Sequence, residues 1–94
     1  MSGIKLSNDQ ILQTMHRSMA RSLGEVSLAG MDFFADPHVA LENPTEYTRM
    51  LQAVLGSGAE LVLREVIDAI YRDAGIEPVP GSSLKDCMNT IRPR

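Results

Sequence analysis

Hydrophobic residues recur at intervals of three and four positions along most of the chain, the spacing that gathers them on one face of a helix. The alternation typical of a strand is almost absent. We therefore expect an all-α fold, a small bundle of four to five helices in a single domain covering residues 1–94. The expected helices cover residues 8–23, 25–35, 44–55, 58–74 and 83–91.

Short-range signals mark the helix ends. A serine is followed three residues later by a residue that completes a capping box at Ser7–Gln10, Ser57–Glu60 and Ser83–Asp86. Asn43 and Pro44 combine a strong N-cap with proline at the first helical position. Gly75 favours the left-handed position after a helix, with Ile76 folding back on Tyr71 in a Schellman motif.

Outside the helices, we expect residues 1–6 to be flexible and the Pro/Gly-rich segment 77–82 to link the short C-terminal helix to the rest. The 25–35 segment is apolar on several sides. A helix with that pattern is usually sandwiched between others, so we expect neighbours on both faces.

The helix over 58–74 has an apolar arc wider than a helix at the edge of a small bundle needs. Leu61 and Tyr71 project instead into its charged face. Either neighbouring elements or the chain's own tail cover these two residues, or they contact a partner chain. We take this helix as the expected homodimer seam. The expected partner interface comprises Leu61, Val62, Val66, Ile70 and Tyr71.

Composition narrows the function classes. The chain has 94 residues, 44% hydrophobic and 22% charged, with a net charge of −3, a balance typical of a globular domain. Its nine basic residues form no run, which disfavours nucleic-acid or anionic-membrane binding. A single cysteine, the lack of a signal-peptide pattern and the lack of a long apolar run favour a cytoplasmic protein that does not span a membrane.

Gly56-Ser57-Gly58 is the stretch most similar to a phosphate-binding loop. It lacks the third glycine of a dinucleotide loop and the lysine of a P-loop. Glu60 supplies the negative charge that a helix N-terminus favours. We therefore interpret the stretch as a helix corner, although its free amides leave anion binding open.

No residue pattern indicates catalysis, a metal or a cofactor. His16 has no ligand-like partner, and His38 has only Glu42, in a proline-bounded loop. Cys87 has no nearby histidine to activate it and is expected in the core. We therefore expect a protein that is not an enzyme and carries no metal and no cofactor.

The segment 43–76 carries Asn43-Pro44-x-x-Tyr47, then Gly56-x-Gly58-Ala59-Glu60, then Ala69-Ile70-Tyr71. In these features it resembles a family of small archaeal helical domains of unknown function. The resemblance implies a helical fold and assigns no residue a role.

We expect a non-enzymatic protein–protein interaction or regulatory module, homodimeric through the 58–74 helix. The alternative is a small-molecule sensor, because methionine and aromatic residues suit an adaptable apolar pocket. That pocket is expected to be lined by Met15, Met19, Phe33, Phe34 and Met50. A third interpretation is a DNA-binding transcriptional regulator using the helix pair within 44–74, although acidic residues on its second helix disfavour it.

Overall fold

The computed structural model describes residues 5–92, which form α-helices, one short 3-10 turn and no strand. The expected all-α bundle is confirmed. Its elements are α1 (Asn8–Leu23), α2 (Glu25–Phe34), α3 (Pro37–Glu42), α4 (Pro44–Leu55), η1 (Gly56–Gly58), α5 (Ala59–Asp73) and α6 (Leu84–Ile91).

The helix α3 is an addition to the expected set, in a stretch interpreted from sequence as a loop. Asp36 caps it by accepting a hydrogen bond from the backbone N–H of His38 at 2.9 Å, and Pro37 occupies its first turn. Both are standard helix-start signals. They were missed because only six residues follow before Asn43 ends the helix.

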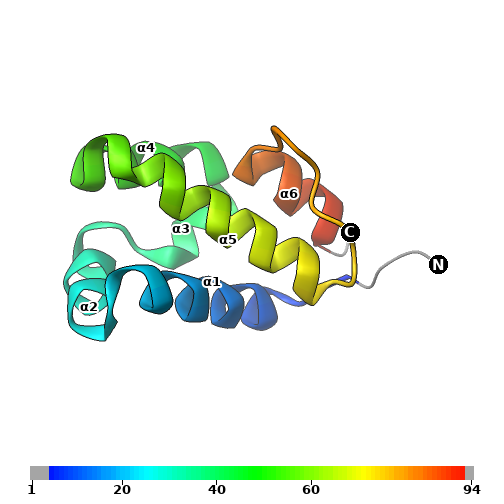
Figure 1. The fold of residues 1–94 in the computed structure, drawn as a ribbon, viewed down its shortest axis with the longest axis horizontal. Helices are drawn as coiled ribbons and strands as arrows, with labels where there is room; N and C mark the ends of the chain where they lie inside the picture. Colours follow the sequence, from blue (N-terminus) through cyan, green and yellow to red (C-terminus); the bar gives the residue numbers. More distant parts are fainter. Residues whose placement is uncertain (1–4, 93–94) are drawn as a thin grey trace.

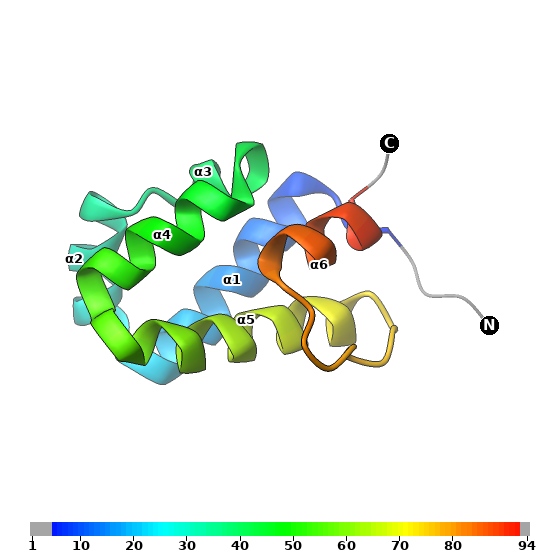
Figure 2. The same cartoon turned by 90° about the horizontal axis from the view of Figure 1, so that it is seen from above.

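The helices α1 and α5 pack along each other in opposite directions and form the long body of the molecule (Figure 1). The helix α4 packs against α5, and α6 packs against both α4 and α5. Figure 2 shows that α2 lies at one end of the long axis and α6 near the other. The molecule measures 38 × 22 × 21 Å.

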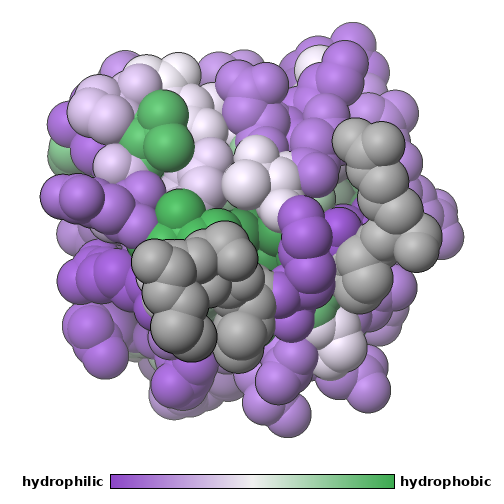
Figure 3. Space-filling model, turned by 90° about the vertical axis from the view of Figure 1, so that its right-hand side faces the viewer, coloured by the Kyte–Doolittle hydropathy of each residue, from purple (hydrophilic) through white to green (hydrophobic). Residues whose placement is uncertain are grey.

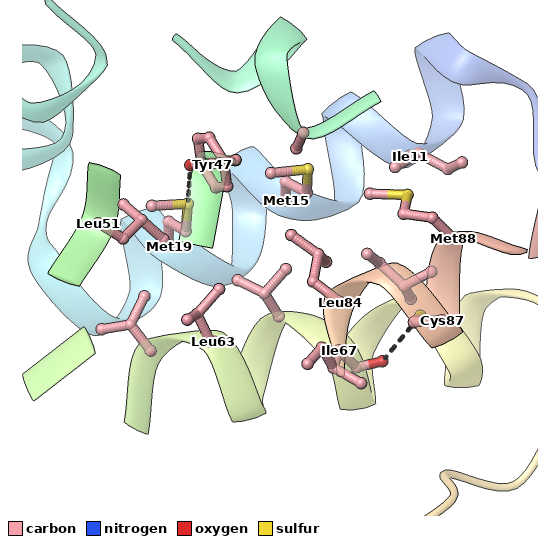
Figure 4. Close-up of a cluster of buried hydrophobic side chains, with 14 of the residues drawn as sticks. Ile11, Met15, Met19, Tyr47, Leu51, Leu63, Ile67, Leu84, Cys87 and Met88 are labelled. Carbon is pink, nitrogen blue, oxygen red and sulfur yellow. Dashed lines mark hydrogen bonds between the residues drawn. The ribbon is translucent and has the colours of Figure 1, made fainter. Parts of the chain in front are cut away.

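The core is built from the inner faces of the helices (Figure 4). Tyr47 of α4 is almost fully buried and donates its hydroxyl to the sulfur of Met19 at 3.5 Å. Cys87 is fully buried, as expected, and burial raises the pKa of its thiol to about 12. Large side chains with almost no exposure include Ile11, Met15, Leu28, Leu51, Ile70, Met88 and Ile91.

Most helix ends follow the expected signals. The capping boxes at Ser7 and Ser83 form, and the side chain of Asn43 caps α4. The Schellman motif is also confirmed: the N–H of Ile76 donates to the carbonyl of Tyr71 at 2.9 Å, while Gly75 has a φ of 72°.

The expected capping box at Ser57 is wrong. The chain passes from α4 through η1 into α5, and Gly58 keeps a helical conformation with φ −67° and ψ −20°. A capping residue needs extended backbone, so no side chain caps α5. The turn is made at Gly56, whose φ of 60° and ψ of −134° suit glycine alone.

The first described residues lie against α6. Leu6 is buried, and its N–H donates to the carbonyl of Ile91 at 3.1 Å. Lys5 donates to the carbonyl of Thr90 at 2.6 Å. The expected flexibility of residues 1–6 stays a prediction, and residues 1–4 lie outside the described residues. The segment 77–82 lies between α5 and α6.

Candidate protein-docking surface

The interface residues expected on α5 are mostly inside the molecule. Val62, Val66 and Ile70 belong to the chain's own core, and Ile70 has no exposed surface at all. A side chain already packed inside the monomer is not free to pack against a partner. The wide apolar arc of α5 is filled by α1, α4 and α6, so the expected seam on α5 must be corrected.

Tyr71 and Leu61, which project into the charged face of α5, differ in burial. Tyr71 is buried, and its hydroxyl lies 2.7 Å from the hydroxyl of Ser82 in the segment before α6. The chain's own tail therefore covers Tyr71, one of the two explanations left open by the sequence. Leu61 remains 65% exposed and is the one expected interface residue that faces solvent.

The expected apolar pocket does not form. Met15 and Met19 are buried in the core, and Met50 packs partly buried against it. Phe33 and Phe34 lie on the outer surface. The five residues therefore do not line a common cavity, because the methionines lie in the core or against it and the aromatic rings lie on the outer surface.

The outer face of α2 carries the most exposed large apolar side chains of the described residues. Val26 is 89% exposed, Phe33 85% and Phe34 67%. Ala29 and Gly30, also exposed, lie between them, and the space beside the Cα of Gly30 is open. We call Val26, Ala29, Gly30, Phe33 and Phe34 the α2 strip. It contains no charged side chain.

The α2 strip arises because α2 is apolar on several sides but packs against the bundle on only one of them. Its inner face buries Leu28 and Met31, next to the buried Ala35, against the rest of the bundle. The expectation that α2 is sandwiched between other elements is therefore wrong, and its second face is uncovered. The rings of Phe33 and Phe34 meet edge to face, with centroids 5.4 Å apart, which fixes them as one aromatic unit.

An acidic edge runs beside the strip. Glu25 and Asp32 lie seven positions apart, two helical turns along the same side of α2. Glu25 is exposed and lies 3.4 Å from the ring of His16. The Oδ1 atom of Asp32 is buried without a hydrogen-bond partner among the described residues. Burial raises the pKa of Asp32, His16 lowers it, and Asp36 raises it.

The surface at the opposite end of the molecule differs. Figure 3 views the end near α6, which is mostly hydrophilic, with hydrophobic residues in small separate areas. The arginines elsewhere are largely engaged: Arg17 pairs with Asp73 at 2.6 Å, and Arg49 pairs with Glu46 at 2.5 Å. The DNA-binding interpretation remains a prediction.

A hollow lies between α4, α5 and the segment before α6, with a volume of about 750 Å³. Its walls combine the apolar side chains of Leu63, Ile67 and Leu84 with the charged side chains of Arg64 and Asp68. None of the residues of the expected Met/Phe pocket lines it.

The described part of the chain contains no candidate for a metal site and none for a membrane-spanning helix. Within residues 5–92, no group of three or more histidine, cysteine, aspartate or glutamate side chains is placed to hold a metal ion. Likewise, none of the described helices combines the length and apolar character needed to cross a membrane.

Comparison with protein families, with curated proteins and with solved structures found no match in any of the three. The resemblance of segment 43–76 to small archaeal helical domains therefore stays a prediction, and the function of the chain has to be argued from its own surface.

Proposed function

We propose that this chain is a non-enzymatic interaction module that binds a partner protein through the α2 strip. The observation that carries the proposal is the exposure of two adjacent phenylalanines, 85% and 67%. At roughly 200 Å² for a fully exposed ring, the two side chains present about 300 Å². The largest apolar patch on a typical monomer has about this size and often marks a functional surface.

Two further features support docking at this place. Aromatic residues are enriched in the centres of protein interfaces, because they bury a large rigid area with little loss of side-chain freedom. The strip also lies on a regular helix that is held by its buried inner face, so it is presented in one conformation. The cytoplasmic location expected from the sequence is part of the proposal, and the single buried free thiol of Cys87 fits it.

Site-specific photo-crosslinking in the source cell tests the proposal. A photoreactive phenylalanine analogue replaces Phe33 in one variant and the exposed Asn89 of α6 in a control variant. We expect one discrete protein adduct from position 33 and none of that mass from position 89. Equal labelling from the two positions, or no protein adduct from position 33, would contradict the proposal.

A small-molecule sensor is the second candidate, supported by the groove between α4 and α5. Its volume of about 750 Å³ lies within the range of roughly 300–1,000 Å³ that ligand sites occupy. A ligand held there should raise the Tm of the wild type and raise it less for Leu63→Ala, which enlarges the wall of the groove. A metabolite panel that leaves the Tm unchanged counts against the sensor.

A further inference from the structure

We propose that the partner of the α2 strip is an amphipathic helix whose apolar face is flanked by lysine or arginine residues. This inference rests on the proposed docking function and adds the chemistry of the occupant. It follows from the charges around the strip, the orphaned carboxylate of Asp32, and the shape of the strip.

Charge is unevenly distributed along the chain. The segment 22–48, which includes α2 and α3, contains none of the nine basic residues of the chain. It contains five of the 12 acidic residues, which are Glu25, Asp32, Asp36, Glu42 and Glu46. The nearest histidines, His16 and His38, contact Glu25 and Asp36 and carry positive charge only when protonated. Glu46 already pairs with Arg49, so the complementary charge for a basic partner lies at Glu25, Asp32 and Asp36.

Asp32 adds a specific point of contact. A carboxylate oxygen that is buried without a hydrogen bond is unfavourable for the folded protein. Asp32 lies on the edge of α2 next to the strip, so a guanidinium or ammonium group from a docked helix can approach that edge. A cation held at that edge would offset the negative charge of the Asp32 carboxylate.

A second copy of this chain fits less well. The helix α2 contains acidic residues and no lysine or arginine. In an antiparallel two-fold pair of α2 helices the same edge of each copy lies on the same side, so Glu25 of one copy would lie near Asp32 of the other. Like charges opposed in this way disfavour the pairing, and α2 has no cation to offset them.

The shape of the strip fits a helix. Val26 and Phe33 are two turns apart on α2, and the small residues Ala29 and Gly30 lower the surface between them. A large side chain from a crossing helix fits in that depression, as ridges pack into grooves between helices. The ten-residue length of α2 gives a contact about 15 Å long, enough for three turns of a partner.

The probe is a displayed library of helical peptides of about 18 residues, with a fixed leucine stripe and random flanking positions. The full chain is used as bait, and binders to its Phe33→Ser variant are removed. We expect lysine and arginine to be enriched at the flanking positions. A synthetic peptide of the enriched type should bind the Glu25→Gln/Asp32→Asn variant about tenfold more weakly, and this difference should shrink at about 1 M salt, where charges are screened.

The alternative outcomes separate the two proposals. Binders that need Phe33 but carry neutral or acidic flanks would leave the docking function standing and overturn the basic partner. An absence of any binder that depends on Phe33 would also overturn it, while crosslinking from position 33 reports separately on docking. A dimer seen in sedimentation for the wild type and lost in Phe33→Ser would place a second copy on the strip, which contradicts the inference.

Discussion

Apolar residues of this molecule contribute differently to its stability, depending on whether they are buried or exposed. Ile70 has no exposed surface, and Phe33 is 85% exposed. Truncating a buried isoleucine leaves a cavity and loses packing, which lowers the free energy of unfolding by about 2–5 kcal/mol. An exposed side chain has little packing to lose.

We therefore expect Ile70→Ala to lower the urea midpoint strongly and Phe33→Ser to leave it almost unchanged, within about 0.5 kcal/mol. Phe33→Ser should still abolish the crosslinked adduct when the photoreactive group is moved to the neighbouring Phe34. If Phe33→Ser unfolds the chain, the ring is a packing residue and the α2 strip is wrongly assigned.

Asp32 is one residue through which stability depends on pH. Its pKa in the folded chain is raised above the ordinary value of 3.8, mainly by burial. The folded state therefore holds this proton more tightly than the unfolded state does. The stability contributed by the protonated carboxyl is present below the unfolded pKa and is lost as pH rises through the folded pKa.

At neutral pH, Asp32→Asn should raise the free energy of unfolding by about 1 kcal/mol, because it removes a partly buried charge without a partner. Melting curves should show a Tm higher by several degrees at pH 7, with the gap closing as the pH approaches 4. The exposed Glu42→Gln serves as the charge-matched control. A gap that stays constant with pH would mean that the charge of Asp32 is not responsible.

At the scale of the element, the sequence predicted well where local chemistry decides. The five expected helices form, and the caps at Ser7 and Ser83 and the Schellman turn at Gly75 form with them, because each depends on residues within one or two turns. The interface on α5 and the Met/Phe pocket were wrong, because helical periodicity shows which face is apolar and not which element covers it. The apolar surplus of α2 was visible in the sequence, but its uncovered face was not.

The two glycines of the corner between α4 and α5 differ in backbone conformation, and only one of the two positions requires glycine. Gly56 has φ 60° and ψ −134°, which an L-residue adopts only with strain, and Gly58 has ordinary helical angles with open space beside its Cα. Gly56→Ala should destabilise the chain by about 1–3 kcal/mol. Gly58→Ala should stabilise it by about 0.4–1 kcal/mol, because it restricts the unfolded chain.

Urea unfolding of the two variants side by side checks this contrast. Both substitutions add the same single methyl group, so each is the matched control for the other. Equal effects of the same sign would show that backbone conformation does not fix this corner. The reversed order would indicate that the turn is made at Gly58.

The whole molecule is polarised. The helices α1, α4, α5 and α6 pack together and form the body of the molecule. A backbone hydrogen bond from Leu6 to Ile91 joins the two ends of the described chain. The α2 end instead carries uncovered aromatic rings beside an acidic edge. Replacing Asp32, or covering the two rings with another element, would raise the free energy of unfolding, and the chain does neither. Such a pattern is expected where a surface is kept for binding.

The acidic edge and the aromatic rings at the α2 end should act on different rates, the first on association and the second on dissociation. Long-range charge acts on the encounter of the partners, whereas apolar contact holds the complex once it has formed. For a lysine-flanked helical peptide, Glu25→Gln should lower the association rate severalfold with little change in dissociation. Phe33→Ala should raise the dissociation rate by about tenfold or more and leave association almost unchanged.

Stopped-flow binding measured over a range of salt concentrations resolves these rates. The wild-type association rate should fall as salt rises and converge with that of Glu25→Gln, because screening removes the long-range attraction in both. Arg49→Gln is the matched control, since it removes a charge of opposite sign that is already paired with Glu46. An association rate independent of salt would mean that the acidic edge does not guide the partner, and that the rings alone select it.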